Sequence, residues 1–351
     1  MTRLHLVGLP HNDPVRATEY CAFAQRIRRL ADALTALGHH VTLYAGPGNE
    51  AAVAEHVVVV TPNDRRAWFG TETFTTNVFG HWDPTEPCWE GMNTETILQL
   101  GQRVGPGDII GLTAGRCQQA IAEAFPNHVK AEVFAGYEGI MPELTHICFE
   151  SEAWRHFQYG RHRIDDGRYY DIVLPNFFDP EDYDIRADHD GYLLFLGRMT
   201  ARKGLAVVAE LAKHHRVITA GQGDDRVPGA EHVGVVTGDD KRKLLAGAKA
   251  ILCPTQYVEP FGGVAVEAQM SGTPVIATPW GAFQETVAPG VSGYLCHTLA
   301  QFLAAAGNAD RLDRAHIASR ARARYSTGSV APRYGRWLDR LGTLYDKGWY
   351  Q

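Results

Sequence analysis

Cysteine is scarce in this 351-residue chain, which has six cysteines and no C-x-x-C pair. This spacing argues against a structural zinc site or a dithiol redox centre and is typical of free thiols in a reducing compartment. Long hydrophobic runs are also missing, since none approaches the ~20 apolar residues of a membrane-spanning helix. The apolar run at residues 4–10 is shorter than the core of a secretory signal. We therefore expect a cytoplasmic protein without an integral membrane segment, for which peripheral membrane contact stays open.

The chain also lacks an excess of positive charge. Its formal net charge is −6, with 34 Lys and Arg against 40 Asp and Glu. The basic cluster of Arg26, Arg28 and Arg29 lies in a helical pattern with Asp32, so we interpret it as a charged helix face. Nucleic acid is therefore disfavoured as a partner. The 45% content of hydrophobic residues is that of a globular protein, and the length allows two cores.

Strands and helices alternate along both halves of the sequence. Runs such as EHVVVV, DIIGLT and HICFE read as strands separated by helical patterns. This alternation predicts parallel sheets covered by helices on both faces. Residues 175–191, rich in Asp and Pro, interrupt the alternation as a linker, after which YLLFLG restarts it. We predict two Rossmann-like, doubly wound α/β domains at 1–178 and 179–330, followed by a helix in 331–351.

The last helical pattern has one apolar face, formed by Trp337, Leu338, Leu341, Leu344 and Tyr345. These residues must be buried, either on the second domain or by crossing back onto the first. A small molecule in such a fold binds at the carboxyl ends of the strands. The cleft between the domains is therefore the expected site.

Two glutamates flank a Phe-Gly-Gly turn in VEPFGGVAVEAQMSGTPVIAT, residues 258–278. A helix that starts at the two glycines offers unpaired N–H groups, which phosphates bind. Glu259 precedes this helix and Glu267 lies about one turn inside it. Because carboxylates accept hydrogen bonds from vicinal hydroxyls, the pattern predicts a ligand with hydroxyls at both ends and phosphate in the middle. A nucleotide sugar has this order, whereas two solvent-facing charges are the simpler alternative.

A second signal lies in LLFLGRMTARKG, residues 193–204. After a strand and a turn at Gly197, Arg198 and Lys203 stand at the carboxyl edge, where two cations suit a diphosphate. The segment TAGQGDD follows another strand, and its backbone at Gly221 is a candidate for holding the base. The GDD fragments are explained by a turn and a helix N-terminus, so we expect no metal site.

These segments resemble a known family. GRMTARKG and EPFGGVAVEA are similar to the paired signatures of the retaining, GT-B-fold glycosyltransferases of family 4, the group-1 family. LPNFFD resembles the interdomain segment of that family, and GTPVIATPWGAFQETVAPGVSGYL resembles its region after the second glutamate. The resemblance covers residues 172–296 strongly and the N-terminal half mainly in architecture. It implies a GT-B fold, in which two Rossmann-like domains face each other across a cleft.

The resemblance also implies roles for individual residues. Arg198 and Lys203 would bind the donor diphosphate, Glu267 the ribose, and Glu259 the hydroxyls of the transferred sugar, so that Arg198, Lys203 and Glu259 serve catalysis. Retention without a bound metal is implied as well, with no cofactor and with a UDP-hexose as the expected donor. The backbone positions implied to contact sugar and phosphate are Phe261, Gly262 and Gly263.

The acceptor side departs from the family pattern. The first loop, GLPHNDPVRATEY, lacks a double glycine that many members carry, and GDIIGLTAG ends in threonine where many have histidine. Loop residues that follow a strand or mix polar and aromatic groups are the alternatives, although exposed loop positions explain them equally well. These candidates are His11, Asn12, His81, Asp83 and Thr113.

The function expected from these patterns is transfer of a sugar from a nucleotide sugar to a hydroxyl of a small-molecule, lipid or glycan acceptor. Two alternatives stay open. One is a GT-B relative with different chemistry, such as a phosphorylase or an epimerase. The other is a nonenzymatic sugar-nucleotide-binding protein, which the joint presence of Glu259, Arg198 and Lys203 argues against.

Overall fold

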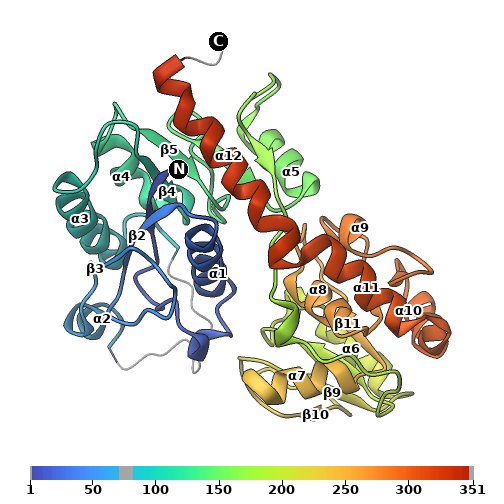
Figure 1. Ribbon diagram of the computed structural model, residues 1–351. Helices are drawn as coiled ribbons and strands as arrows, with labels where there is room; N and C mark the ends of the chain where they lie inside the picture. Colours follow the sequence, from blue (N-terminus) through green and yellow to red (C-terminus); the bar gives the residue numbers. More distant parts are fainter. Residues whose placement is uncertain (1, 71–81, 348–351) are drawn as a thin grey trace.

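The computed structural model describes residues 2–70 and 82–347 and forms two lobes, each built on a parallel sheet (Figure 1). The sheet of the N-terminal lobe runs, in spatial order, β3 (Glu55–Val58), β2 (His40–Ala45), β1 (Arg3–Val7), β4 (Ile109–Leu112), β5 (Val129–Glu132), β6 (His146–Phe149) and β7 (Ile172–Val173). The sheet of the C-terminal lobe runs β10 (Glu231–His232), β9 (Val217–Ala220), β8 (Leu193–Leu196), β11 (Ala250–Cys253), β12 (Val275–Ala277) and β13 (Gly293–Leu295).

Helices cover both faces of each sheet. The N-terminal lobe contributes α1 (Ala22–Ala36), α2 (Pro62–Phe69), α3 (Pro87–Gly101), α4 (Gln119–Ala124) and α5 (Glu152–His162). The later part of the chain forms α6 (Leu205–Ala212), α7 (Gly238–Gly247), α8 (Gly263–Met270), α9 (Phe283–Thr286), α10 (Leu299–Asn308), α11 (Arg314–Tyr325) and α12 (Thr327–Lys347). Short 3-10 turns lie at η1 (Arg16–Thr18), η2 (Gly115–Gln118), η3 (Pro180–Asp182), η4 (Ala201–Lys203) and η5 (Ala309–Arg311).

The central strands are buried on both faces because helices pack on both sides of each sheet. Ile109 and Ile110 are fully buried neighbours on β4, and they belong to different hydrophobic clusters because successive side chains of a strand point to opposite faces. Leu193 and Leu194 on β8 divide in the same way. The prediction of two doubly wound, parallel α/β domains is confirmed.

The chain passes between the lobes twice, and the two crossings are hydrogen-bonded to each other. The Phe178 N–H donates to the Tyr325 carbonyl at 2.9 Å, and the Thr327 N–H donates to the Phe178 carbonyl at 2.9 Å. Beyond this point α12 runs across the N-terminal lobe (Figure 1), where Tyr334 and Trp337 are buried in its core. Burial of each such side chain contributes roughly 1.5–3 kcal/mol. Of the two destinations that the sequence allows for this helix, the structure has the one on the first lobe.

A second contact joins the lobes at the start of α5. The Ser151 hydroxyl donates to the Pro260 carbonyl at 2.6 Å. The Glu285 carboxylate accepts from the N–H groups of Glu152 and Ala153 at 3.0 and 2.8 Å. An acidic side chain is favourable at a helix N-terminus because it meets unpaired N–H groups and the positive end of the helix dipole. This contact therefore positions the segment before α8 against the N-terminal lobe.

Candidate active site

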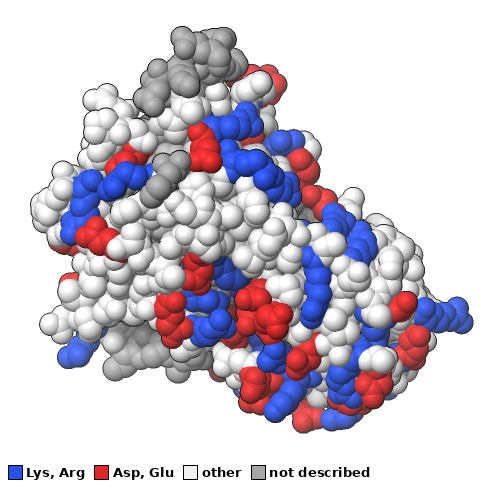
Figure 2. All heavy atoms as spheres, in the orientation of Figure 1, with Lys and Arg blue, Asp and Glu red and all other residues white. Residues whose placement is uncertain are grey.

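A cavity of about 330 Å³ lies between the lobes, a size within the range of small-molecule sites. Its C-terminal wall consists of the loops that follow β8, β9 and β11 together with α7 and α8. Its N-terminal wall consists of η1's end and α1, the loop after β5, and residues 176–178. Side chains of both charges gather along the junction of the lobes (Figure 2). The strand order reverses at β1/β4 and at β8/β11, which is where open α/β sheets form a crevice.

Lys203 and Glu259 form an ion pair on the C-terminal wall, with 2.9 Å between Nζ and Oε2. The residues are 56 positions apart and meet because β8 and β11 pair directly, so the loops that follow them are neighbours. The Glu259 side chain is only 9% exposed and that of Lys203 21%. Removal of either partner would leave the other charge shielded from water and unpaired, which is costly.

Arg198 lies on the same wall, directly after Gly197. Its side chain is exposed to the cavity, and among the described residues it forms no ion pair. Nearby, burial and the Glu259 carboxylate raise the pKa of Tyr257 above its ordinary value, whereas the charge of Arg198 lowers it. Beside the paired Lys203, Arg198 is therefore a cation without an ion pair among the described residues.

Helix α8 begins at the cavity, as its glycines predict. Gly262 is the N-cap, with φ 73° and ψ 52°, and a Cβ there would lie 2.5 Å from the Phe283 ring. Gly262 and Gly263 line the cavity. The Phe261 ring points away, being 4% exposed and packed edge-on against Tyr325 in the core. Phe261, predicted to contact the donor through its backbone, is not among the residues that line the cavity.

Glu267 joins three segments of the C-terminal wall. Its Oε1 atom accepts from Lys241 Nζ on α7 at 2.5 Å and from the Tyr183 hydroxyl of the linker at 3.0 Å. Burial raises the pKa of Tyr183 well above its ordinary value, and the adjacent carboxylate adds to this. The Tyr183 hydroxyl therefore stays protonated and acts as a donor.

The ends of β8 and β9 approach each other through two glycines that line the cavity. A Cβ on Gly221, whose φ is +143°, would lie 1.8 Å from the Gly197 carbonyl oxygen. The Gly221 N–H already donates to the Gly234 carbonyl at 2.8 Å. Close backbone packing thus accounts for Gly221, whereas a Cβ on Gly197 would meet nothing within 4 Å.

Comparison with known proteins adds a family to this geometry. Residues 190–309 match the family model described as Glycosyl transferases group 1. Over this segment the chain is similar to the group-1 glycosyltransferases. An uncharacterised glycosyltransferase of Methanocaldococcus jannaschii is 35% identical over 124 residues, covering 30% of this chain and 32% of that protein. A phosphatidyl-myo-inositol mannosyltransferase of Mycobacterium tuberculosis is 31% identical over 190 residues, covering 47% and 50%. The chain thus spans about a third to a half of these curated relatives.

Solved glycosyltransferase structures share the whole fold. Sucrose-phosphate synthase from Thermosynechococcus elongatus superposes with a TM-score of 0.74 at 17% identity, over 97% of this chain and 99% of that one. The Anabaena HepE protein, solved in complex with UDP-glucose, gives a TM-score of 0.66 at 14% identity over 97% and 100%. Identity at this level shows the fold alone, and the predicted GT-B architecture is confirmed.

Of the acceptor-side candidates, those that the structure describes lie outside the cavity lining. The His11 ring contacts Trp82, with 5.6 Å between ring centroids, and Asn12 is buried nearby in the same loop. Asp83 is exposed and accepts from the Thr85 N–H at 2.9 Å, a bond that lowers the pKa of its carboxyl. His81 belongs to residues 71–81, outside the described residues.

Thr113, the remaining candidate, is fully buried. Its N–H donates to Gln118 Oε1 at 2.7 Å, and its hydroxyl donates to the Val7 carbonyl at 2.8 Å. Gln118 also donates to the Gly8 carbonyl. These bonds tie the end of β4 to the end of β1, so the polar groups of Thr113 are satisfied within the protein.

Three residues that sequence reasoning did not assign to the site line the N-terminal wall: Tyr137, Arg26 and Arg29. Tyr137 follows β5, and burial together with the Glu259 carboxylate raises its pKa. The rule that loops after strands face the cleft would have selected it. The sequence pattern predicts that the arginines form a charged, solvent-facing side of the helix. The structure differs, because Arg26 is only 6% exposed. The interpretation changes because this face of α1 points into the cleft.

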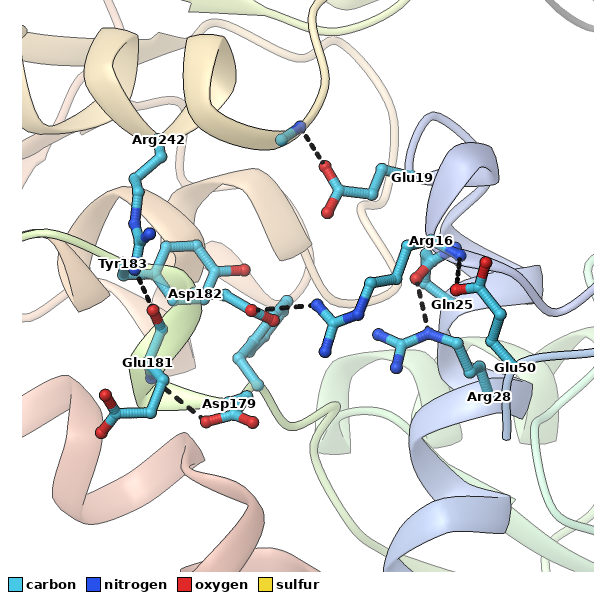
Figure 3. Close-up of polar contacts among 12 residues, drawn as sticks. Arg16, Glu19, Gln25, Arg28, Glu50, Asp179, Glu181, Asp182, Tyr183 and Arg242 are labelled. Carbon is cyan, nitrogen blue, oxygen red and sulfur yellow. Dashed lines mark hydrogen bonds and ion pairs between the residues drawn. The ribbon is translucent and has the colours of Figure 1, made fainter. Parts of the chain in front are cut away.

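Two polar contacts cross the cleft at the edge of this cavity (Figure 3). Arg16 Nη1 lies 3.2 Å from Asp182 Oδ1. Glu19 Oε2 accepts from the Gly238 N–H at 2.8 Å, at the N-terminus of α7. Both contacts come from the segment before α1. They hold the lobes together at an exposed rim.

In the part of the chain that the structure describes, no three His, Cys, Asp or Glu side chains are grouped as they would be around a metal ion. Over the same ranges, no helix combines the length and apolarity needed to cross a membrane.

Proposed function

We propose that this protein transfers a sugar from a nucleotide-sugar donor to a hydroxyl of an acceptor, with retention and without a bound metal. The observation that carries the proposal is the Lys203–Glu259 pair beside Arg198, at the N-terminus of α8 in the interdomain cavity. It combines cations and helix N–H groups for a diphosphate with a carboxylate for sugar hydroxyls.

The cations would act on the leaving group. When the bond from the anomeric carbon to the phosphate oxygen breaks, the electron pair goes to the diphosphate, which gains negative charge. Arg198 and Lys203 would stabilise that charge, and one preorganised donor of this kind is worth about 2.7–4 kcal/mol. Lys203 would move from Glu259 towards the phosphate, leaving the carboxylate to accept from the sugar hydroxyls.

We propose a UDP-hexose as the donor. Support comes from the HepE protein, which shares the fold and was solved with UDP-glucose. Glu267 would hold the ribose from the far end of the wall, where Lys241 and Tyr183 fix its carboxylate. The acceptor would be a small molecule, lipid or glycan in the cytoplasm or at a membrane surface, approaching from the N-terminal wall.

Donor binding should close the lobes, since a carbon with oxocarbenium character must be shielded from water. The rim contacts Arg16–Asp182 and Glu19–Gly238 are exposed and few, so small rotations cost little. Small-angle scattering should show compaction on addition of UDP-hexose. An unchanged radius of gyration at demonstrated saturation would count against closure.

The central test is a thermal-shift screen of UDP, GDP and ADP sugars, followed by transfer assays with a radiolabelled donor. A ligand present at a hundred times its dissociation constant stabilises by about 2.7 kcal/mol. We expect stabilisation by one donor and appearance of labelled glycoside. Label that stays in nucleotide sugars of changed stereochemistry would indicate an epimerase, and binding without any turnover would indicate a binding protein.

A further inference from the structure

Arg26 and Arg29 lie three residues apart on α1, so their side chains are neighbours on one helix face. Both line the interdomain cavity, and both also line a smaller pocket beside it together with Asn176. Arg26 is 6% exposed and Arg29 is half-buried. Two guanidinium groups are thus held side by side, away from bulk water.

Within the described part of the chain, the Arg26 guanidinium makes a single hydrogen bond. Its Nη1 donates to Glu150 Oε1 at 2.7 Å, and the group stacks over the Phe134 ring with 3.8 Å to the centroid. Its Nε and Nη2 atoms are buried without a hydrogen-bond partner. Because a buried charged donor is expensive to leave unpaired, these atoms point to an absent ligand.

The positive charge of Arg29 has fewer protein partners than that of Arg26. Its guanidinium lies 4.8 Å from the Phe178 ring centroid, and its buried Nε makes no hydrogen bond. Across the described ranges, no carboxylate oxygen lies within the 4.0 Å that defines an ion pair with Arg29. The negative charge of Glu267 favours the protonated form of Arg29, but this carboxylate is already paired with Lys241. Burial lowers the pKa of Arg29, but an arginine stays charged at neutral pH.

The other cations that line the cavity lie on the opposite wall, and most of them form ion pairs with carboxylates. Lys203 and Lys241 pair with glutamates, and Arg242 pairs with Asp184. Arg198 lies beside the proposed donor diphosphate. The two arginines of the N-terminal wall have one paired carboxylate, Glu150, between them, so one positive charge remains that the proposed donor does not need.

We propose that Arg26 and Arg29 form a second anion site, which binds a phosphate or carboxylate group of the acceptor. The proposal rests on the proposed function, because it takes the donor diphosphate to lie on the C-terminal wall. The planar guanidinium forks match both kinds of oxyanion. The Asn176 amide oxygen, also buried without a partner, accepts from a hydroxyl next to that anion.

The test uses inorganic phosphate as the probe and the full-length protein saturated with UDP, so that the donor's anion positions are filled. Calorimetric titration measures phosphate affinity in wild type, in Arg29→Gln and in Arg66→Gln. Arg66, an exposed residue of α2 outside the cavity lining, matches the charge change. We expect phosphate affinity about tenfold lower in Arg29→Gln only, with unchanged UDP affinity in all three proteins. UDP binding doubles as the check on folding.

The proposal is overturned if phosphate does not bind UDP-saturated wild type, if phosphate displaces UDP, or if Arg29→Gln leaves phosphate binding unchanged. A loss of UDP affinity in Arg29→Gln that equals its loss of phosphate affinity also overturns it, by assigning the arginine to the donor. If UDP does not bind at all, the proposed donor is wrong. The phosphate titration without nucleotide then tests the anion site by itself. A tenfold lower phosphate affinity in Arg29→Gln than in wild type supports the site, and equal phosphate affinity in the two proteins rejects it.

Discussion

The two walls of the cavity differ in how their charges are balanced. On the C-terminal wall, Lys203 pairs with Glu259 and Lys241 with Glu267. On the N-terminal wall, Arg26 pairs with Glu150, whereas Arg29 has no ion-pair partner among the described residues. On the first wall both glutamates are paired with lysines and Arg198 is left without an ion pair, whereas on the second wall Arg29 and part of the Arg26 guanidinium lack a partner among the described residues. Under the proposed function, this difference would make the donor side preformed and the acceptor side dependent on the anion that it binds.

The largest effect is expected from removing the cations of the C-terminal wall. Lys203→Ala and Arg198→Ala should each lower kcat by about 10²–10³, equivalent to about 2.7–4 kcal/mol, because each removes a preorganised charge from the leaving group. Lys213→Ala, at a 62% exposed position, is the control. Steady-state kinetics with folding checked by circular dichroism provides the measurement, and wild-type turnover in both variants would contradict the diphosphate assignment.

A pH-dependent effect is expected on the opposite side, at Glu132. This buried carboxyl accepts from the Met141 N–H at 2.6 Å and the Thr145 hydroxyl at 2.9 Å, which holds the loop that carries Tyr137. Burial raises its pKa from 4.5 to about 7. The folded state therefore keeps a proton that the unfolded state loses, and stability falls as pH rises from about 4.5 to 7.

The contribution lost over this range is up to about 3 kcal/mol, at 1.36 kcal/mol per pKa unit. Denaturant unfolding of wild type and Glu132→Gln at pH 5, 6, 7 and 8 measures it. The stability of wild type should decline relative to the variant and level off above pH 7. A difference that is constant with pH would show that Glu132 is ionised throughout.

The backbone of the C-terminal wall is the third target. Gly221→Ala should destabilise the protein by about 1–3 kcal/mol from its backbone conformation alone, and the contact with the Gly197 carbonyl adds to this. Gly160→Ala, on α5 with open space around its Cβ, should instead stabilise by up to about 1 kcal/mol. Thermal unfolding compares the two variants. Equal changes in Tm would mean that the backbone moves away from the new Cβ at position 221 with little loss of stability.

The two glutamates divide the C-terminal wall further. Glu267→Gln should weaken UDP and the intact donor alike, by about 1–3 kcal/mol, because both ligands carry the ribose. Glu259→Gln should leave UDP affinity unchanged and lower donor affinity or turnover, since its partners are sugar hydroxyls. Calorimetric titration with UDP and with donor tests both variants. Equal loss of UDP binding in the two would place the sugar end elsewhere.

The smallest effect is expected where the walls meet. Arg16 is 58% exposed and Asp182 31%, so Arg16→Ala should change stability by only about 0.2–1 kcal/mol. The difference should shrink in 1 M salt, which screens exposed pairs. Thermal unfolding at low and high salt measures it. A large, salt-independent loss would indicate that the rim, rather than the double crossing at Phe178, holds the lobes together.

Much of the proposed donor side follows from sequence because its residues are local to strand ends. Gly197, Arg198 and Lys203 fall within one turn and short helix after β8, so their common location needs only a strand and its loop. The acceptor side could not be read in this way. His11 and Thr113 also follow strands, yet one packs on tryptophan and the other bonds the β1 and β4 ends. Following a strand places a residue near the cleft without deciding what its side chain contacts.

By itself, the sequence determined the alternation of strands and helices, the two parallel sheets, and the glycine turns with their flanking charges, because each depends on neighbours within one or two turns of chain. Only the tertiary structure decided that Arg26 meets Glu150 across 124 positions, that the face of α1 points into the cavity, and that α12 packs on the first lobe. Hydrophobic periodicity says that a face must be buried. Which surface buries it depends on sheet order and on how the two lobes meet, and these arise from contacts between distant segments.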